Sequence, residues 1–585
     1  MAKCVVVLTL LLFAAGCSKS PAQKVAQLTE EFVYTSLSFS PSSATAAGLH
    51  EFKKQKLDEM LDDFSPASLD RQQKTYEEFQ KRLKEIPAES LAPEDRADYT
   101  VLEDQTEAAL LDLTVIHSAL HSPTMYVETL GNALFSPYVL EYAPKPQRYK
   151  AIIARLEKIP LFLDQAALNL IASPPIWTEV ATDENQGNID LVDKTIRTGV
   201  PDDMRDAYAR AARPALEAMN KFQAFLKNNL TARTGFDWRL GQDRYTRKFR
   251  VSLEIGVEPD TILDQAERRL AEVRAHMLEL ARPIHAGLFP AHHDHPELSG
   301  DAQVNAIVGE VLGKIAERHS TRESYMDDAR KDLDEARSFV QEKHLLKLPA
   351  RSNLQVIPTP EFMRGVYSVG GFNAAPALEP QLGAFYWVTP IPAAWPAERV
   401  ESKLREYNVY KLKLLTIHEA MPGHYVQIEM ANNVEPLGRR LLRSVYGNGA
   451  YVEGWAQYAT QMMLEQGFAN HSAEMDLTFA KEELRVVANA ILDIRLQMLN
   501  MTDEDALDLM MKQTFQEKEE ATGKLQRAKL TSAQLPMYFV GWRGWNRVRD
   551  EQQKAKGSAF NLAAFHDAAL ASGAVPLPVL GRLFK

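Results

Sequence analysis

The chain has 585 residues, of which 45% are hydrophobic and 25% are charged, and its formal net charge is −11. This balance is typical of a globular protein and excludes a disordered chain, a collagen-like repeat and a polytopic membrane protein. The negative charge argues against nucleic acid as a partner, because binding to phosphates needs a basic surface. A chain of this length buries a large core and is expected to form more than one lobe.

The first residues have the pattern of a secretion signal. Lys3 supplies a positive charge, residues 5–13 form an apolar run, and the small residues 14–16 precede Cys17. This end resembles a bacterial lipobox, although Ala14 stands where such boxes more often have Leu. We therefore expect a signal peptide over 1–16.

In a lipobox, Cys17 would be lipidated and would anchor the protein firmly in the cell envelope. Ser18, rather than Asp, would by resemblance suit the outer membrane, with the protein facing the periplasm. Residues 17–27 are then a polar tether, and the membrane is reached through the N-terminal lipid only. The alternative is an ordinary signal peptide cleaved nearby, with Cys17 incidental. No cysteine occurs after Cys17, so no disulfide within the chain can hold the folded body.

Most of the remaining chain has apolar residues three and four apart, the spacing of amphipathic helices. One predicted helix begins at Pro259 and is expected to end at Pro283. Another begins with Ser65 as N-cap and Pro66 in the first helical position. Similar patterns predict helices over 146–171, 202–230, 301–342, 400–432, 450–466, 475–500 and 503–523. The fold class is therefore mainly α: a multi-helical, two-lobed protein with an N-terminal lobe over 28–235 and a second lobe over 236–585.

One stretch near 350–390 lacks the helical period. Residues 353–358 and 383–389 are rich in β-branched or aromatic side chains and predict two strands, and residues 370–373 between them predict a turn. This small β-hairpin or sheet either binds an extended peptide along its edge, with Tyr386 as a candidate contact, or packs one lobe as a structural element. The histidine-rich residues 291–296 are predicted to be a solvated loop rather than a metal site.

The segment from His418 to His424 carries the chemistry. Glu419 follows the first histidine, as in zinc peptidases, but the histidines are six residues apart rather than four. In a straight helix this spacing places them roughly 120° apart, so they would not bind one metal. Pro422 and Gly423 predict a kink or wide turn that swings His424 back towards His418.

Glu453 is the candidate third ligand, 29 residues after His424 and in an aromatic segment. Two histidines, one glutamate and a water form the open site of a catalytic zinc, and two imidazoles with one carboxylate favour zinc over other divalent ions. Glu419 is then the general base for the attacking water. The alternative is a kinked structural helix with satisfied histidines and a surface acid at Glu453.

The motif and its surroundings resemble the DUF885 family of bacterial putative lipoproteins. The matching pattern is His418-Glu419-x-x-Pro422-Gly423-His424-x-x-Gln427, followed by Glu453-Gly454-Trp455-Ala456-x-Tyr458, with further matches at 146–174, Asn408, Tyr538-x-x-Gly541, Arg549, Phe565-His566-Asp567-Ala568, Gly573 and Pro576-Leu577. The resemblance covers nearly all of the mature chain. It implies a mostly helical, gluzincin-like metallopeptidase architecture with one Zn²⁺ per chain.

The resemblance also implies roles for individual residues. His418, His424 and Glu453 would be the metal ligands and Glu419 the base. Tyr538 is a candidate donor to the oxyanion, or a core aromatic residue. The remaining candidates are Arg549, which either clamps a substrate carboxylate or lies on the surface, and His566, which either donates to the tetrahedral intermediate or caps the final helix.

One position departs from the family pattern. Family members often have Asp-x-Gly-Leu-His where this chain has Asp493 to Gln497, with Arg495 replacing the glycine and Gln497 the histidine. If that histidine binds substrate in relatives, specificity or activity here would differ.

The sequence thus predicts a zinc metallopeptidase that cleaves short peptides in the periplasm, as an exopeptidase or an oligopeptidase. The alternative is a lipoprotein that binds peptides without cleaving them and holds a structural metal. The sequence does not indicate the residue preference, endo- or exo-action, or the oligomeric state.

Overall fold

The computed structural model describes residues 19–584, apart from 234, 292–294, 365–366 and 368. The fold is mainly α with a small sheet, as the sequence predicts. The predicted signal peptide and Cys17 lie outside the described residues. Within the described ranges, no helix combines the length and the apolar character that a membrane span requires.

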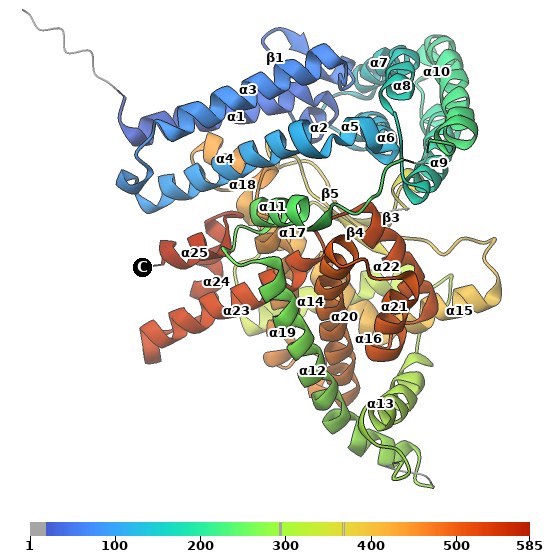
Figure 1. Ribbon diagram of the computed structural model, residues 1–585, viewed down its shortest axis with the longest axis vertical. Coiled ribbons are helices and arrows are strands. Elements are labelled where there is room, and N and C mark those ends of the chain that lie inside the picture. Colours follow the sequence, from blue (N-terminus) through green and yellow to red (C-terminus); the bar gives the residue numbers. More distant parts are fainter. Residues whose placement is uncertain (1–18, 234, 292–294, 365–366, 368, 585) are drawn as a thin grey trace, which may run out of the picture.

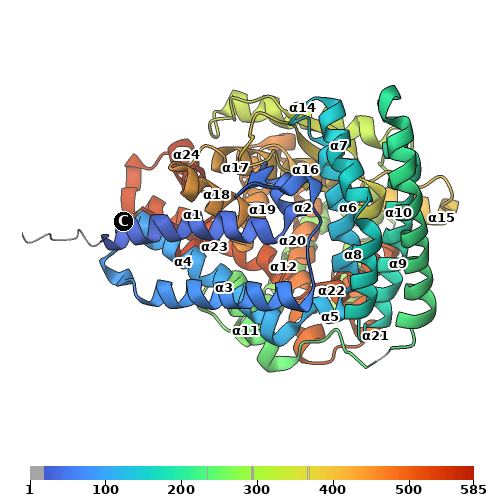
Figure 2. The same ribbon diagram turned by 90° about the horizontal axis from the view of Figure 1, so that it is seen from above.

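Helices α1 to α10 form the N-terminal half (Figure 1, blue to green). In Figure 2, α1, α3 and α4 run alongside one another, and α6 to α10 stack beside them. A two-residue hairpin of β1 (Glu51–Phe52) and β2 (Gln55–Lys56) follows α2. The helices are α1 (Pro21–Phe39), α2 (Pro41–Ala46), α3 (Pro66–Lys84), α4 (Pro93–Leu111), α5 (Ser118–His121), α6 (Pro123–Val139), α7 (Lys145–Leu156), α8 (Ile159–Asn169), α9 (Pro175–Asp190) and α10 (Arg205–Phe225).

The start of α1 corrects the predicted tether, because residues 21–27 are helical. The Ser20 side chain accepts a hydrogen bond from the backbone N–H of Gln23, and the Gln23 side chain accepts one from the backbone N–H of Ser20. This capping box satisfies two backbone donors and fixes the first turn. Val25 is buried in the core with the rest of α1, so the polar segment ends at residue 20.

The second half of the chain contains the longer helices and the chemical motif. Its helices are α11 (Gly241–Leu253), α12 (Pro259–Leu288), α13 (Gly300–Ala316), α14 (Tyr325–Lys343), α15 (Ala397–Glu406), α16 (Val409–Glu419), α17 (His424–Ala431), α18 (Leu437–Val445), α19 (Gly449–Glu465), α20 (Ala473–Met498), α21 (Asp503–Asp508), α22 (Lys518–Leu530), α23 (Pro536–Lys556), α24 (Leu562–Ala571) and α25 (Leu577–Leu583). Several predicted helices are each divided, with 301–342 forming α13 and α14, and 400–432 forming α15 to α17.

The predicted end of the helix at Pro283 is wrong, because α12 continues to Leu288. Its buried face includes Ala281 before the proline and His285 after it. Packing of this face therefore outweighs the loss of one backbone hydrogen bond at the proline.

The small sheet has three strands, β3 (Leu354–Pro358), β4 (Gly370–Asn373) and β5 (Ala384–Val388), in the order β3-β5-β4. β3 runs parallel to β5, and β4 runs antiparallel to it. The two predicted strands are present, but their parallel pairing excludes a hairpin. Residues 370–373, predicted as a turn, form the edge strand β4, because they pair with residues 385–388 of β5.

The central strand β5 lies between two hydrophobic cores. Phe385 and Trp387 pack into a core formed mostly by residues 126–230, whereas Tyr386 and Val388 pack into the main core of the second half. Side chains alternate across a strand, so both faces of β5 are buried. The two halves of the chain therefore meet at the sheet, next to the elements that carry the chemical motif (Figure 1).

Candidate metal centre

The turn between α16 and α17 brings the two histidines together. α16 ends at Glu419, α17 begins at His424, and the backbone N–H of Gly423 donates to the Ile417 carbonyl at 2.9 Å. The helix thus breaks at the predicted Pro-Gly position, and the imidazole centroids are 4.7 Å apart. A Cβ atom on Gly423 would lie 1.9 Å from the carbonyl oxygen of His418, so only glycine fits this turn.

Glu453 faces both histidines from α19. Its Oε2 atom lies 3.5 Å from Nε2 of His418 and 3.4 Å from Nε2 of His424. These spacings match the edge of a tetrahedron about a zinc ion, which is about 3.4 Å for bonds of about 2.0–2.2 Å. The same Oε2 atom is buried and has no hydrogen-bond partner. A buried carboxylate oxygen that has no hydrogen-bond partner and faces two imidazoles would be satisfied by a bound cation.

The electrostatics of this triad favour an ionised carboxylate. Burial lowers the pKa of His418. Burial also opposes protonation of His424, but the neighbouring Glu453 prevails and raises its pKa. For Glu453 burial opposes ionisation, yet the two imidazoles hold the pKa of the carboxyl well below its usual range. Glu453 is therefore ionised and would supply the anionic ligand, whereas His424 would have to be neutral to bind a metal.

The triad adjoins a cavity of about 80 Å³ that His418, Glu419 and Tyr538 help to line. Glu419 directly follows His418, as the glutamate follows the first histidine in the His-Glu-x-x-His motif of zinc peptidases. The Tyr538 ring lies nearly parallel to the His418 ring, with centroids 6.2 Å apart. Burial raises the pKa of the Tyr538 phenol to about 12, so its hydroxyl keeps its proton at neutral pH. The structure thus brings together all five residues predicted to form the centre.

A close helix crossing sets the position of Tyr538. Gly454 of α19 and Gly541 of α23 are in contact, and a Cβ atom on Gly541 would lie 2.0 Å from the carbonyl oxygen of Ala450. Gly454 directly follows Glu453, and Gly541 lies one helical turn after Tyr538. This contact therefore holds the candidate ligand and the phenol near each other.

Tyr386 does not contribute to the cavity. It lies on the central strand β5, is fully buried, and its hydroxyl forms a hydrogen bond of 3.2 Å with the hydroxyl of Thr416. Because both faces of its strand are covered, its position favours the structural alternative for this sheet over contact with substrate. The edge strand β4, whose Gly370 lines the cavity, is the part of the sheet that faces the site.

His566 and Arg549 also lie away from the cavity lining. His566 is buried, with its ring nitrogens 2.8 Å from the Leu345 carbonyl oxygen and 2.9 Å from the Tyr458 hydroxyl, and burial lowers its pKa to about 4. Arg549 donates to Glu465 at 2.9 Å at the protein surface. Both residues are held by contacts within the fold, and neither lines this cavity.

The departure at Gln497 is structural as well. Its Oε1 accepts a hydrogen bond from the backbone N–H of Leu240 at 2.9 Å, and its Nε2 donates to the Thr531 carbonyl at 3.2 Å. Gln497 joins two chain segments inside the core and does not line the cavity. The metal triad is therefore unaffected by this replacement.

Four basic residues of the cavity wall escaped the sequence reasoning: Lys411, Arg485, Lys524 and Arg527. Lysines and arginines on helices usually face solvent, so nothing in their residue type marks these four as lining a cavity. The available signal was the spacing of Lys524 and Arg527, which are three apart and share one face of α22.

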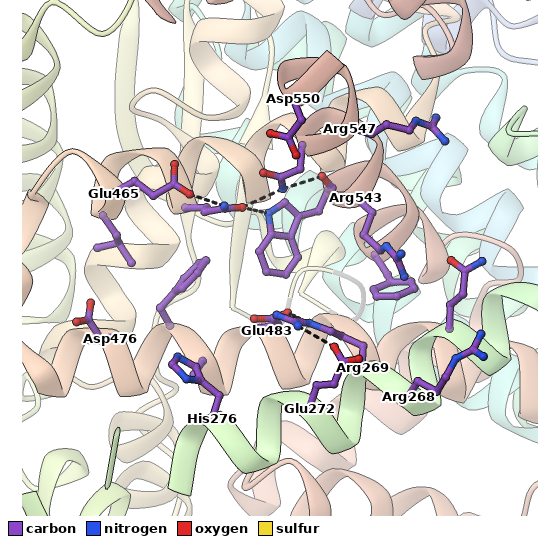
Figure 3. Close-up of a pocket in the computed structure, with 18 of the residues that line it drawn as sticks. Arg268, Arg269, Glu272, His276, Glu465, Asp476, Glu483, Arg543, Arg547 and Asp550 are labelled. Carbon is purple, nitrogen blue, oxygen red and sulfur yellow. Dashed lines mark hydrogen bonds and ion pairs between the residues drawn. The ribbon is translucent and has the colours of Figure 1, made fainter. Parts of the chain in front are cut away.

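A larger cavity of about 1110 Å³ lies elsewhere, between α12, α20 and α23 (Figure 3). In Figure 3, Arg543 extends from α23 towards α12, which carries Arg269 and Glu272. None of the residues predicted to form the centre lines it. The candidate metal centre therefore adjoins the smaller of these two cavities.

A second group of ligand-type side chains consists of His285, His295 and Glu310. Glu310 oxygens lie 2.7 Å from Nε2 of His285 and 3.3 Å from Nε2 of His295. A spacing of 2.7 Å is that of a hydrogen bond and is shorter than the edge of a zinc tetrahedron. His295 belongs to the predicted solvated loop, whose residues 292–294 lie outside the described part of the chain.

Comparisons with known proteins agree with the resemblance noted in the sequence. A protein described as a "putative lipoprotein of unknown function" from Shewanella oneidensis is 28% identical with a TM-score of 0.76, over 97% of this chain and 100% of that one. A "putative lipoprotein" from Colwellia psychrerythraea shares the fold at 18% identity with a TM-score of 0.75, over 96% of this chain and 98% of that one. Metallocarboxypeptidase 1 of Trypanosoma cruzi aligns over 96% of this chain and 91% of its own, but at 9% identity and a TM-score of 0.38 that likeness supports no inference.

No curated protein matches the chain. The family model for the "bacterial protein of unknown function (DUF885)" matches residues 41–583, which is nearly the whole of the described chain. The chain therefore belongs to the DUF885 family.

Proposed function

We propose that this protein is a zinc-dependent hydrolase of peptide bonds that acts on short peptides. The observation that carries the proposal is the buried Oε2 atom of Glu453, which has no hydrogen-bond partner and lies 3.4–3.5 Å from both imidazole Nε2 atoms. His418, His424 and Glu453 would hold one zinc ion. When bound, zinc supplies Lewis-acid activation of a water and of the scissile carbonyl.

The remaining residues of the centre have complementary tasks. Glu419 takes a proton from the attacking water and delivers it to the leaving amine. Arg527 donates a hydrogen bond to the oxygen of Tyr538 at 3.2 Å, which leaves the phenolic proton free to point at the substrate. Tyr538 then donates to the oxyanion that forms on the scissile carbonyl.

We also propose that the protein acts in the cell envelope, anchored by a lipid on Cys17. The signal-like residues 1–16 and the description of a 28% identical protein as a putative lipoprotein support this location. Attachment at the outer membrane, facing the periplasm, rests on Ser18 after the lipidated cysteine.

The direct test of the base is the substitution Glu419→Gln. The variant should bind zinc as the wild type does and should fail to cleave a mixed library of short peptides, read by mass spectrometry. Unchanged cleavage would refute the role of Glu419. Cleavage by neither protein, together with peptide binding by both, would instead support a peptide-binding lipoprotein with a structural metal.

A further inference from the structure

Basic side chains are in excess in the wall of the small cavity beside the metal centre. Two of its four cations have acidic partners. Lys411 pairs with Glu482, and Arg485 donates to Glu482 at 3.1 Å and to Glu520 at 3.0 Å. The cavity wall contains three carboxylates, and these buried pairs involve two of them, Glu482 and Glu520; the third is Glu419.

In the part of the chain that the structure describes, Lys524 and Arg527 have no carboxylate in direct contact; the acids that act on them lie at longer range, Glu520 on Lys524 and Glu453 on both. Within the described residues, no carboxylate lies at ion-pair distance from either side chain, and Lys524 is only 5% exposed. Arg527 donates only to neutral oxygens, those of Gln534 and Tyr538, each at 3.2 Å, and its Nε is buried without a partner. Burial lowers the pKa of Lys524 well below its usual range, and an anion bound beside it would favour the charged form. Buried basic groups without a directly bonded anion are costly, so their place in a cavity wall points to an anion site.

The two cations lie close to the reacting groups. Arg527 contacts the Tyr538 hydroxyl, and Tyr538 stacks on His418. An anion held by Lys524 and Arg527 would therefore lie in the cavity that His418, Glu419 and Tyr538 also line. Arginine binds carboxylates through two parallel N–H donors, and a neighbouring ammonium adds a second charge.

The volume of the cavity limits what can carry this anion. About 80 Å³ holds roughly six water molecules at about 10–15 Å³ each. This is room for a small anionic group and little more of a peptide chain. Every unmodified peptide has one carboxylate at its end, whereas an acidic side chain occurs only in some.

We propose that Lys524 and Arg527 form a subsite for the free C-terminal carboxylate of a peptide, so that the enzyme removes the last residue. This inference rests on the proposed function. In the reaction, water adds to the carbonyl carbon of the last peptide bond and its C–N bond breaks. Glu419 passes the water proton to the leaving nitrogen. The products are one free amino acid and a peptide one residue shorter with a new terminal carboxylate.

The test uses two sets of N-dansylated tetrapeptides with a randomised last residue, one ending in a free carboxylate and the other in a carboxamide. Binding of each set to the Glu419→Gln protein is measured by dansyl fluorescence, so that the readout does not depend on turnover. The carboxylate set should bind at least about tenfold more tightly than the carboxamide set. Wild-type protein should release only the last residue, and only from the carboxylate set.

Two substitutions and a control locate the subsite. In the Glu419→Gln background, Arg527→Gln and, separately, Lys524→Met should abolish the preference for the carboxylate set, with folding checked by circular dichroism. Lys524→Met places an apolar side chain in a buried position and keeps the test valid if the arginine variant does not fold. Lys518→Gln removes an exposed cation from the same helix and should leave the preference unchanged.

The outcomes separate this inference from the proposed function. Equal binding of both sets, or carboxamide peptides cleaved as readily as acids, would overturn the subsite while leaving the hydrolase intact. Binding of carboxamide peptides that depends on an acidic side chain would also overturn it. A retained carboxylate preference without any cleavage by wild type would support the subsite and refute the hydrolase.

Discussion

Substitution of Gly423 by alanine tests how tightly the α16–α17 turn fixes the metal ligands. A Cβ atom there would lie 1.9 Å from the His418 carbonyl oxygen and 2.3 Å from that of Ile417. Such contacts are essentially never shorter than 3.0 Å, so the backbone must open by about 1.1 Å. Metal sites tolerate ligand displacements of only about 0.2 Å. We expect zinc affinity to fall by roughly 100-fold or more, and stability by about 1–3 kcal/mol.

Zinc affinity is measured by competition with a chromophoric chelator, and stability by urea unfolding. Gly309→Ala is the control, because no atom lies within 4 Å of its added Cβ. Gly309 is inside α13, so alanine there should stabilise the protein by up to about 1 kcal/mol and leave zinc affinity unchanged. A folded Gly423→Ala protein with wild-type zinc affinity would refute the reasoning.

Four further predictions follow from the same geometry. Glu419→Gln should lower turnover about 100- to 10,000-fold at unchanged zinc content, and an equal loss of zinc would contradict its role as base. Tyr538→Phe should lower kcat about 100-fold or more, and a change confined to KM would argue against an oxyanion donor. Gly541→Ala should destabilise the protein by about 1–3 kcal/mol in urea, since it forces α19 and α23 apart, and unchanged stability would be inconsistent with the crossing. Burial and, to a smaller extent, the nearby Glu128 raise the pKa of Glu184 to about 9, so the free energy of unfolding should fall as pH rises from about 4.5 to about 9. Glu184→Gln should make this fall with pH less steep in urea unfolding at several pH values. An equally steep fall in the variant would contradict the assignment.

The grouping of His418, His424 and Glu453 could be predicted from the local motif together with the family resemblance. The six-residue spacing of His418 and His424 is incompatible with a straight helix, and Pro422-Gly423 between them is a recognisable break. Glu453 was identified from its aromatic surroundings and from the family resemblance. None of these required knowledge of the tertiary fold.

The misplaced residues depend on packing that the sequence does not display. Tyr386 lies on a strand buried on both faces, and a short aromatic run looks the same whether one face or both are covered. Residues 370–373 resemble a turn, and only their pairing with β5 makes them a strand. Lys524 and Arg527 resemble solvent-facing helix residues, and the packing around α22 is what encloses them in the cavity wall.

Metal content by elemental analysis tests the central claim most directly. The comparison is between protein lacking residues 1–17 and its His418→Ala, His424→Ala double variant, both supplied with zinc. The geometry predicts about one zinc per chain at the triad, so the wild type should hold about one more zinc per chain than the folded double variant. Equal zinc in both, or none in folded wild type, would contradict a metal centre at His418, His424 and Glu453.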